Sequence, residues 1–522
     1  MGRERERRGG WGRRGVGDDI VGKLLVCVMS LKPLRNQVHQ LSKMQNFKSH
    51  RKGNNKWWQG PVVLLLLVTL CLATIAVSQL VHKLREHSMG GEEPWEDLCN
   101  ATCDDPCSFV LTESVPDGLV YEVNATKYQS TYNSWINLIN MASSSLDIAS
   151  FYWTLTGSDI NVTDPTSKPG EILLHELGKL PSKNISVRIA SSTFSFPDQL
   201  STDLKILKEK GIHIRKVNFH KLMSGVLHTK LWIVDKKHIY IGSANMDWRA
   251  LTQVKELGAV VYNCSCLAND FSKIFEAYWS LGQPNATIPS PWPSSYSTKF
   301  NKETPLEIKL NGTAAKTYFS SSPPRMCPKG RTTDLDAILS GINAAKKFLY
   351  VSVMEYFPTS RFLRHVLYWP CIDDSLRRAA IERHVHVQML IGYWSHTDKS
   401  MLAYLQSLHA LRNIKKVHFD VKLFIVPVGK FGNIPYARVS HAKYFVTENI
   451  AYIGTSNWSF DYFNSTTGVG LLINQTSEKN EDDTAHHQLI SLFQRDWNSN
   501  YSVTLDDLKD NPNFPFKINE AL

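Results

Sequence analysis

A continuous apolar run, Pro61–Val81, contains no charged residue. At about 1.5 Å per residue in a helix it would cover roughly the 30 Å hydrocarbon core of a bilayer. Trp57 and Trp58 precede it, where an interfacial aromatic belt is expected. The pattern predicts a transmembrane signal anchor over 57–81, and a cleaved signal peptide is the alternative.

A second hydrophobic pattern consists of short β-branched and aromatic runs that alternate with helix-like stretches, and it occurs twice. In the first half the expected strands are 146–153, 185–190, 212–217, 227–235 and 239–248. In the second half they are 348–357, 385–392, 421–429, 440–448 and 451–459. The repeated order predicts an α/β fold of two tandem lobes, each a mixed β-sheet flanked by helices.

Charge is distributed unevenly along the chain. The net charge is +11, but residues 1–56 carry fourteen Lys or Arg and only four Asp or Glu, so the rest of the chain is nearly neutral. We interpret 1–56 as a disordered basic cytosolic tail rather than a nucleic-acid-binding surface. The remaining boundaries are a luminal stalk over 82–107, a first lobe over 108–300 and a second lobe over 301–522.

Glycosylation sequons and cysteines both favour a luminal body. Eleven N-x-S/T sequons follow the apolar run. Four of them, at Asn100, Asn457, Asn474 and Asn500, are not among the expected glycosylation sites. We expect glycans at Asn124, Asn161, Asn184, Asn263, Asn285, Asn311 and Asn464. Seven of nine cysteines also follow the run, as expected in an oxidising compartment.

Four of these cysteines form two clusters, Cys103 with Cys107 and Cys264 with Cys266. The clusters are expected to join through two disulfides, and a zinc site is the alternative. Of Cys99, Cys327 and Cys371, one is expected to stay unpaired because their number is odd.

The candidate chemistry lies in a motif that occurs once in each half. The first copy is His228-x-Lys230-x4-Asp235, followed by Gly-Ser-x-Asn245. The second copy is His441-x-Lys443-x4-Glu448, followed by Gly-Thr-Ser-Asn457. On a strand, residues i and i+2 face the same side, so two such strands could surround one phosphate with imidazoles, ammoniums and amides. The two lysines would supply the positive charge, so we expect no metal and no cofactor.

These motifs resemble those of the phospholipase D superfamily, over roughly residues 105–500. The flanks GSANMDW, LTQVKELG, IPYARV and YIGTSNW are similar to its type II transmembrane subgroup, phospholipases D three and four, the lysosomal 5′-to-3′ exonucleases. The resemblance implies an active site at the pseudo-two-fold interface of the lobes. We expect the disulfide pairs Cys103–Cys266 and Cys107–Cys264.

The resemblance also implies roles for the motif residues. His228 would attack phosphorus and form a phosphohistidine, and His441 would protonate the leaving oxygen and later activate water. Lys230, Lys443, Asn245 and Asn457 would hold the non-bridging oxygens. Glu256 would orient His228, which leaves the group that orients His441 unidentified. Asp235 and Glu448 are included among the site residues, although we expect their role to be structural rather than chemical. The aromatic positions 151–153 and 356–357 are expected to be core rather than a base-stacking platform.

Three functional hypotheses follow. The first is a lysosomal exonuclease on single-stranded DNA and RNA that releases 3′-phosphomononucleotides and limits endosomal nucleic-acid sensing. The second is a transphosphatidylase that makes bis(monoacylglycero)phosphate from a lysophospholipid. The third is an inert membrane glycoprotein that binds phosphate polymers. We expect a single-pass type II membrane protein of the endoplasmic reticulum, Golgi, endosome and lysosome, and we also consider a homodimer.

Overall fold

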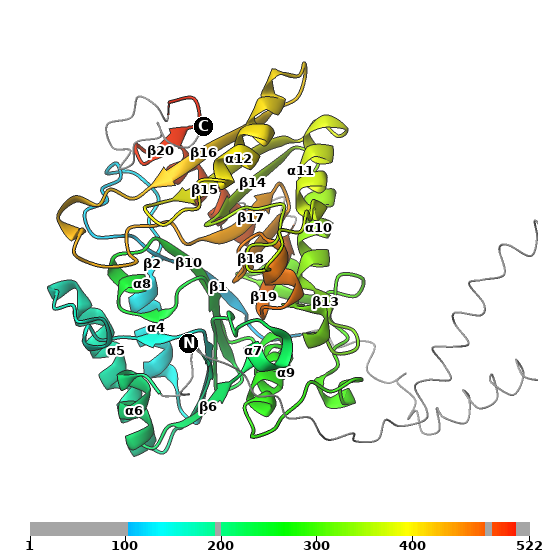
Figure 1. The fold of residues 1–522 in the computed structure, drawn as a ribbon. Helices are drawn as coiled ribbons and strands as arrows, with labels where there is room; N and C mark the ends of the chain where they lie inside the picture. Colours follow the sequence, from blue (N-terminus) through cyan, green and yellow to red (C-terminus); the bar gives the residue numbers. More distant parts are fainter. Residues whose placement is uncertain (1–102, 194–199, 476–482, 508–522) are drawn as a thin grey trace, which may run out of the picture. The chain divides into compact units, whose positions relative to one another are not determined.

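The computed structural model describes residues 103–193, 200–475 and 483–507, which belong to one compact unit (Figure 1). The predicted tail, the predicted span over 57–81 and the stalk up to residue 102 lie outside the described residues. Within the described ranges, no helix combines the length and the apolarity that crossing a membrane requires.

The core of the unit contains two mixed β-sheets with the same strand order (Figure 1). The first runs β2-β1-β10-β8-β7-β3-β5-β6. Its strands are β1 Ser108–Ser114, β2 Gln129–Ser130, β3 Ser145–Ser150, β5 Ser186–Ser192, β6 His213–Val217, β7 Leu231–Val234, β8 His238–Gly242 and β10 Glu256–Tyr262. The strands β3, β5 and β6 are parallel, whereas β7, β8 and β10 pair antiparallel.

The second sheet repeats this order as β12-β19-β18-β17-β14-β15-β16, with β13 beside β12 and with β11 and β20 at the two edges. Its strands are β11 Leu306–Leu310, β12 Thr313–Ser322, β13 Thr332–Thr333, β14 Phe348–Val353, β15 His386–Tyr393, β16 Phe419–Ile425, β17 Lys443–Thr447, β18 Ile450–Gly454, β19 Gly468–Gln475 and β20 Ser502–Thr504. The expected mixed α/β fold is therefore confirmed.

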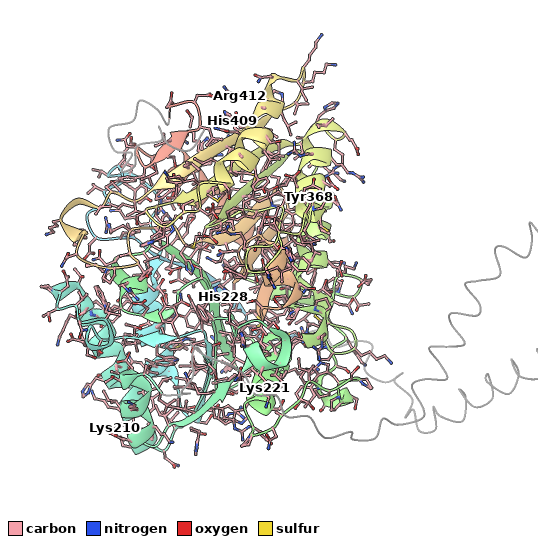
Figure 2. The ribbon with its side chains drawn as sticks, in the orientation of Figure 1. Lys210, Lys221, His228, Tyr368, His409 and Arg412 are labelled. Carbon is pink, nitrogen blue, oxygen red and sulfur yellow. A yellow bond between two sulfur atoms is a disulfide. The ribbon has the colours of Figure 1, made fainter. Side chains whose placement is uncertain are left out.

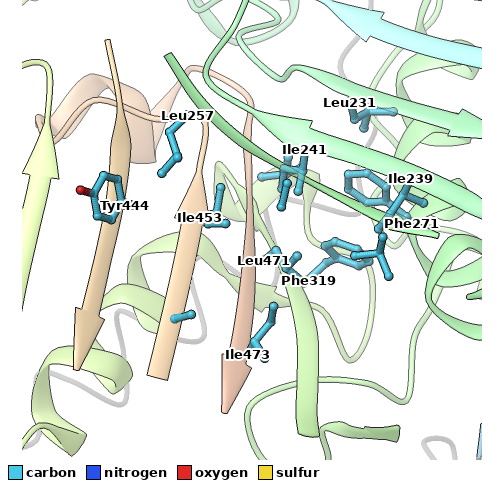
Figure 3. Close-up of a cluster of buried hydrophobic side chains, with 14 of the residues drawn as sticks. Leu231, Ile239, Ile241, Leu257, Phe271, Phe319, Tyr444, Ile453, Leu471 and Ile473 are labelled. Atoms are coloured by element: carbon cyan, nitrogen blue, oxygen red, sulfur yellow. The ribbon is translucent and has the colours of Figure 1, made fainter. Parts of the chain in front are cut away.

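Both faces of the central strands are buried, which explains why their sequences are continuously apolar. In β7, Leu231 and Ile233 enter one core cluster, whereas Trp232 and Val234 enter another. The first cluster lies between the sheets. Figure 3 shows Ile241 and Leu257 of the first sheet beside Ile453 and Leu471 of the second.

Helices cover the two outer faces and complete the shared core. Those on the first sheet are α4 Thr131–Met141, α5 Lys168–Lys179 and α6 Thr202–Glu209, and those on the second are α10 Asp334–Ala344, α11 Cys371–Ile381 and α12 Met401–His409. Two further helices, α9 Ser265–Leu281 and α14 Ala485–Trp497, contribute to the core between the sheets. The equivalent helices α4 and α10 begin alike, because Ser130 and Thr333 each accept a hydrogen bond from the backbone N–H three residues on.

The predicted disulfides are confirmed. Cys103 is bonded to Cys266 and Cys107 to Cys264, and the two bonds tie the start of β1 to the start of α9. Cys327 and Cys371 are free thiols. Cys99 lies outside the described residues.

The sequons differ in how their asparagines are placed. Most of the expected glycan sites are exposed; these are Asn124, Asn161, Asn184, Asn285 and Asn464. Asn311 is different, because its side-chain amide donates to the carbonyls of Phe109 and Asp483 at 3.0 Å each. A glycan on Asn311 would break one of these bonds, so the structure argues against that expectation. Asn457 is buried.

Several predicted strands are too long at the same end of the sheets. The strand expected over 227–235 begins at Leu231, and the one over 440–448 begins at Lys443. The strands expected over 146–153 and 348–357 end at Ser150 and Val353. The apolar pattern continues past the sheet edge because the loops there are also buried, and these loops carry the candidate site.

Candidate active site

The two motif histidines are held by backbone pairing between the halves of the chain. Leu227, just before His228, forms an isolated parallel bridge with Thr467, and Ser440, just before His441, forms one with Lys255. The N–H of His228 donates to the Thr467 carbonyl at 3.2 Å, and the N–H of His441 donates to the Lys255 carbonyl at 2.7 Å. Each histidine is thus positioned by the opposite half. Figure 2 shows His228 near the centre of the described chain.

Glu256, the first residue of β10, is the partner of His441. Its carboxylate oxygens lie 2.9 and 3.1 Å from His441 Nδ1, and Ser243 Oγ donates to it at 2.5 Å. Burial raises the pKa of Glu256, whereas Lys443, the Ser243 hydroxyl and Lys230 favour its ionised form. The expectation that Glu256 orients His228 was wrong, and the group that orients His441 is now identified.

His228 has a different environment. Its ring lies 5.1 Å from the rings of Phe151 and Tyr462, and its buried Nδ1 has no hydrogen-bond partner among the described residues. The position equivalent to Glu256 is Gly468, because Gly258 pairs with Gly242 as Gly470 pairs with Gly454. A Cβ at Gly468 would lie 2.1 Å from Ser456 Oγ. Gly468 therefore supplies no carboxylate to His228, and any side chain at this position would require the Ser456 hydroxyl to move.

Electrostatic coupling shows that the histidines and lysines of both motifs share one site. Burial lowers the pKa of His228, and Lys230, Lys443 and His441 lower it further. Burial, Lys443 and Lys230 likewise lower the pKa of His441. Burial also lowers the pKa of Lys443 to about 7, and that of Lys230 is lowered by burial and by Lys443. Concentrated positive charge in a buried site is suited to an anionic ligand.

The two lysines are fixed in the same way in both motifs. Lys230 Nζ donates to the His228 carbonyl at 2.5 Å, and Lys443 Nζ donates to the His441 carbonyl at 2.6 Å. Both side chains are buried. One ammonium hydrogen on each lysine is therefore engaged with its own motif, which leaves other donors for a ligand.

The side chains of the two motif asparagines form hydrogen bonds with residues that the motif analysis did not include. Asn245 Nδ2 donates to the Tyr152 hydroxyl at 3.5 Å, and Asn457 Nδ2 lies 3.2 Å from the Tyr462 hydroxyl and 3.4 Å from Glu355 Oε2. Tyr152 and Glu355 occupy equivalent positions, two residues after β3 and β14. Matching the two halves residue by residue could have found them.

The aromatic positions divide between core and site. Trp153, Tyr356 and Phe357 are buried, as expected for core residues. Phe151 and Tyr152 are only partly buried, and Phe151 packs against the His228 ring. The core expectation therefore fails for these two residues, because β3 ends at Ser150 and the chain turns toward the site.

Asp235 and Glu448 do not belong to the site. They follow β7 and β17, at the ends of these strands away from the histidines. Asp235 accepts hydrogen bonds from the backbone and hydroxyls of residues 143–145, and these lower its pKa to about 2 against the opposing effect of burial. Glu448 accepts from the N–H groups of Lys346 and Lys347 at 2.8 and 3.3 Å. Asp235 holds the turn that leads into β3, and Glu448 holds the turn that leads into β14. Both carboxylates are therefore structural and not catalytic.

Comparison with known proteins agrees with this geometry. Residues 122–429 match the family model described as "PLD3/4, PLD-like domain". The protein named 5′-3′ exonuclease PLD3 of Xenopus tropicalis is 50% identical over 463 residues, which cover 88% of this chain and 93% of the relative. Its human namesake is 52% identical over 413 residues, covering 78% and 83% of the two chains. The 5′-3′ exonuclease PLD4 of Mus musculus is 46% identical over 458 residues, covering 85% and 91%. The chain therefore belongs to the phospholipase D superfamily, in the family of PLD3/4 PLD-like domains.

Proposed function

We propose that this chain is a phosphodiesterase that acts as a 5′-to-3′ exonuclease on single-stranded DNA and RNA. The observation that carries the proposal is the buried site in which His228, His441, Lys230 and Lys443 influence one another. Such a site can bind a phosphodiester and supply both a nucleophile and a proton donor. The names of the relatives support the direction of cleavage.

The contact of Glu256 favours His441 as the nucleophile, in place of the assignment to His228. When the carboxylate accepts a hydrogen bond from Nδ1–H, Nε2 presents its lone pair to phosphorus. The same carboxylate would stabilise the positive charge that the imidazole gains on attack. The equivalent position beside His228 is Gly468, which has no side chain, so His228 lacks such a partner and is suited to proton transfer.

In the first step, His441 Nε2 forms a bond to phosphorus and the bond from phosphorus to the 5′ oxygen of the remaining strand breaks. His228, whose protonated form is favoured once the anionic phosphate is bound beside it, protonates that oxygen, while the two lysines stabilise the non-bridging oxygens. The 5′-terminal nucleotide is then attached to His441 through its 3′ phosphate. In the second step, His228 takes a proton from water, the hydroxyl attacks phosphorus, and the N–P bond breaks to release a 3′-phosphomononucleotide.

We further infer that the two sheets are the duplicated lobes of the superfamily, with the site at their pseudo-two-fold interface. The identical strand order and the paired bridges support this inference. The two disulfides support a luminal location, because such bonds persist in oxidising compartments. An endolysosomal compartment, a single membrane anchor over 57–81 and a role in limiting nucleic-acid sensing complete the proposal.

The activity can be tested with the full-length protein purified in detergent. A 3′-labelled single-stranded oligonucleotide with a 5′ hydroxyl is incubated at about pH 5.5 in EDTA. Stepwise loss of nucleotides bearing 3′ phosphates from the 5′ end is expected, and His441→Ala should abolish it. Cleavage that vanishes in EDTA and returns with added zinc or magnesium would contradict the proposed chemistry. Headgroup exchange on lysophosphatidylglycerol without cleavage would favour the lipid hypothesis.

The roles of the two histidines can be separated with a substrate whose leaving 5′ oxygen is replaced by sulfur. A thiolate leaves without protonation, so a variant that lacks only the proton donor is expected to recover on this substrate. We expect His228→Ala to release the strand once and accumulate a nucleotide adduct on His441, detected by mass spectrometry. His441→Ala should remain inactive. Recovery of His441→Ala instead of His228→Ala would reverse the assignment.

A further inference from the structure

A cavity of about 140 Å³ lies at the carboxyl ends of β15 and β16. It is lined chiefly by the loops that follow these strands, residues 394–396 and 426–438. Because β14, β15 and β16 are parallel, their carboxyl ends lie at one edge of the sheet (Figure 1), where α/β proteins commonly bind ligands.

The end of β15 also packs against the backbone next to His441. A Cβ added at Gly392 would lie 2.4 Å from the Ser440 carbonyl oxygen and 3.2 Å from that of Met354. Arg438, which lines the cavity, is three residues before His441 in the chain. The cavity is therefore a neighbour of the histidine site, although none of the motif residues lines it.

Three aromatic side chains of the lining form a connected set. The rings of Trp394 and His396 lie 4.7 Å apart, and His396 and Tyr436 stack at 4.9 Å with an interplanar angle of 23°. Tyr436 is 65% exposed, so part of its ring is open to a ligand. Its φ of 52° is a left-handed conformation that costs energy for a bulky residue, and such strain concentrates at binding sites.

The charged group of the lining is already engaged. The Arg438 guanidinium donates to the carbonyls of Pro427 and Asp117 and to Gln253 Oε1. With its cation paired in this way and three aromatic rings in its wall, the cavity is better suited to a flat ring than to a phosphate.

We propose that this cavity binds one nucleobase of the single-stranded substrate, stacked on Tyr436 and His396. A protein cavity of roughly 150 Å³ accommodates benzene, so about 140 Å³ admits one ring of a base, and the second ring of a purine would extend over the exposed side of Tyr436. Stacking on an aromatic side chain tolerates any base, as an exonuclease that removes every nucleotide requires. An acyl chain has no flat face to stack on these rings. The inference rests on the proposed exonuclease function and adds to it a subsite for the base.

The test compares two strands of equal length, one with normal bases and one in which every base is replaced by an abasic analogue. We expect Tyr436→Ala to raise KM on the normal strand about 5- to 150-fold, the range for loss of one stacked base. It should leave kcat within about twofold and change KM little on the abasic strand. Tyr436→Phe, which keeps the ring, should behave as the wild type. Tyr368→Ala removes a tyrosine ring of similar exposure, 67% against 65%, that does not line the cavity, and serves as the matched control.

A second readout is independent of turnover. In the His441→Ala background, a strand containing the fluorescent base 2-aminopurine should be quenched on binding, and Tyr436→Ala should remove that quenching. Equal KM increases on both strands would show only a structural role for Tyr436, and an unchanged KM on the normal strand would also overturn the proposal. Loss of lysophosphatidylglycerol exchange with normal nuclease activity would make this a lipid site. If the wild type cleaves neither strand, the exonuclease proposal itself fails.

Discussion

Replacing Glu256 with glutamine tests the central contact of the site. Glutamine has nearly the same shape and can still accept from His441 Nδ1, so the packing around Ser243 and β10 is kept. It carries no negative charge, however, and cannot stabilise the imidazolium that forms when His441 attacks phosphorus. If His441 is the nucleophile, Glu256→Gln should slow the first chemical step.

The size of the effect follows from the contact itself. A hydrogen bond of 2.9 Å between a buried carboxylate and an imidazole is charge-assisted. Hydrogen bonds to charged groups contribute about 1.5–3 kcal/mol. At about 1.4 kcal/mol for each factor of ten, the rate of the first step should fall roughly 10- to 150-fold. KM should change by less than about threefold, because the contact strengthens only as charge develops.

The assay is a single-turnover experiment on the 3′-labelled strand with enzyme in excess, quenched over a time series. The matched control is Glu448→Gln, the same substitution at a buried-strand end away from the histidines. Thermal unfolding of both variants checks that each is folded. The control should keep the rate of the first step within about twofold of the wild type.

A Glu256→Gln variant with an unchanged first step would refute the assigned role of the carboxylate. So would an equal loss of rate in Glu256→Gln and Glu448→Gln, because the effect would then be one of stability. A loss that appears only in the second step, seen as accumulation of the nucleotide adduct, would show that Glu256 acts after the covalent intermediate has formed.

Three further predictions concern charge and stability. Burial lowers the pKa of Lys443 to about 7, so the side chain is a cation below that pH and loses its charge above it. We therefore expect kcat/KM to fall as the pH rises through about 7. A kcat/KM profile that stays flat to pH 9 would contradict this. Asp235→Ala removes the hydrogen-bond acceptor for the turn at residues 143–145 and should lower stability by about 1–3 kcal/mol after allowance for solvent screening. The expected readout is a lower Tm at unchanged kcat. A lower kcat in fully folded protein would show that Asp235 belongs to the active site. Replacing Cys107 and Cys264 with serine leaves the Cys103–Cys266 bond, which closes almost the same loop. Removing both bonds should cost about 2–5 kcal/mol of stability, and the decrease in Tm for the single removal should be less than half of the decrease for the double removal. Equal decreases would mean that the two bonds do not constrain the same loop.

The sequence alone was enough to predict the class of fold and the two H-x-K motifs that the structure brings close together. Strands with two buried faces are continuously apolar, so their order could be read in both halves, and the two H-x-K motifs stand out at equivalent places in that order. The same reasoning overextended the strands, because a buried loop and a buried strand have the same apolar composition. That is why Phe151 and Tyr152 were assigned to the core although they turn toward the site.

Only the tertiary structure shows which histidine has a carboxylate partner and which half of the chain supplies it. Glu256 and His441 are 185 residues apart in the chain, and no local pattern relates them. They meet because Lys255 and Ser440 pair across the two sheets, a contact set by how whole sheets pack. Strand pairing within each sheet places Gly468, which has no side chain, at the position in the second sheet that Glu256 occupies in the first. Local periodicity specifies strands and motifs, whereas the asymmetry that separates a nucleophile from a proton donor arises only where distant segments come into contact.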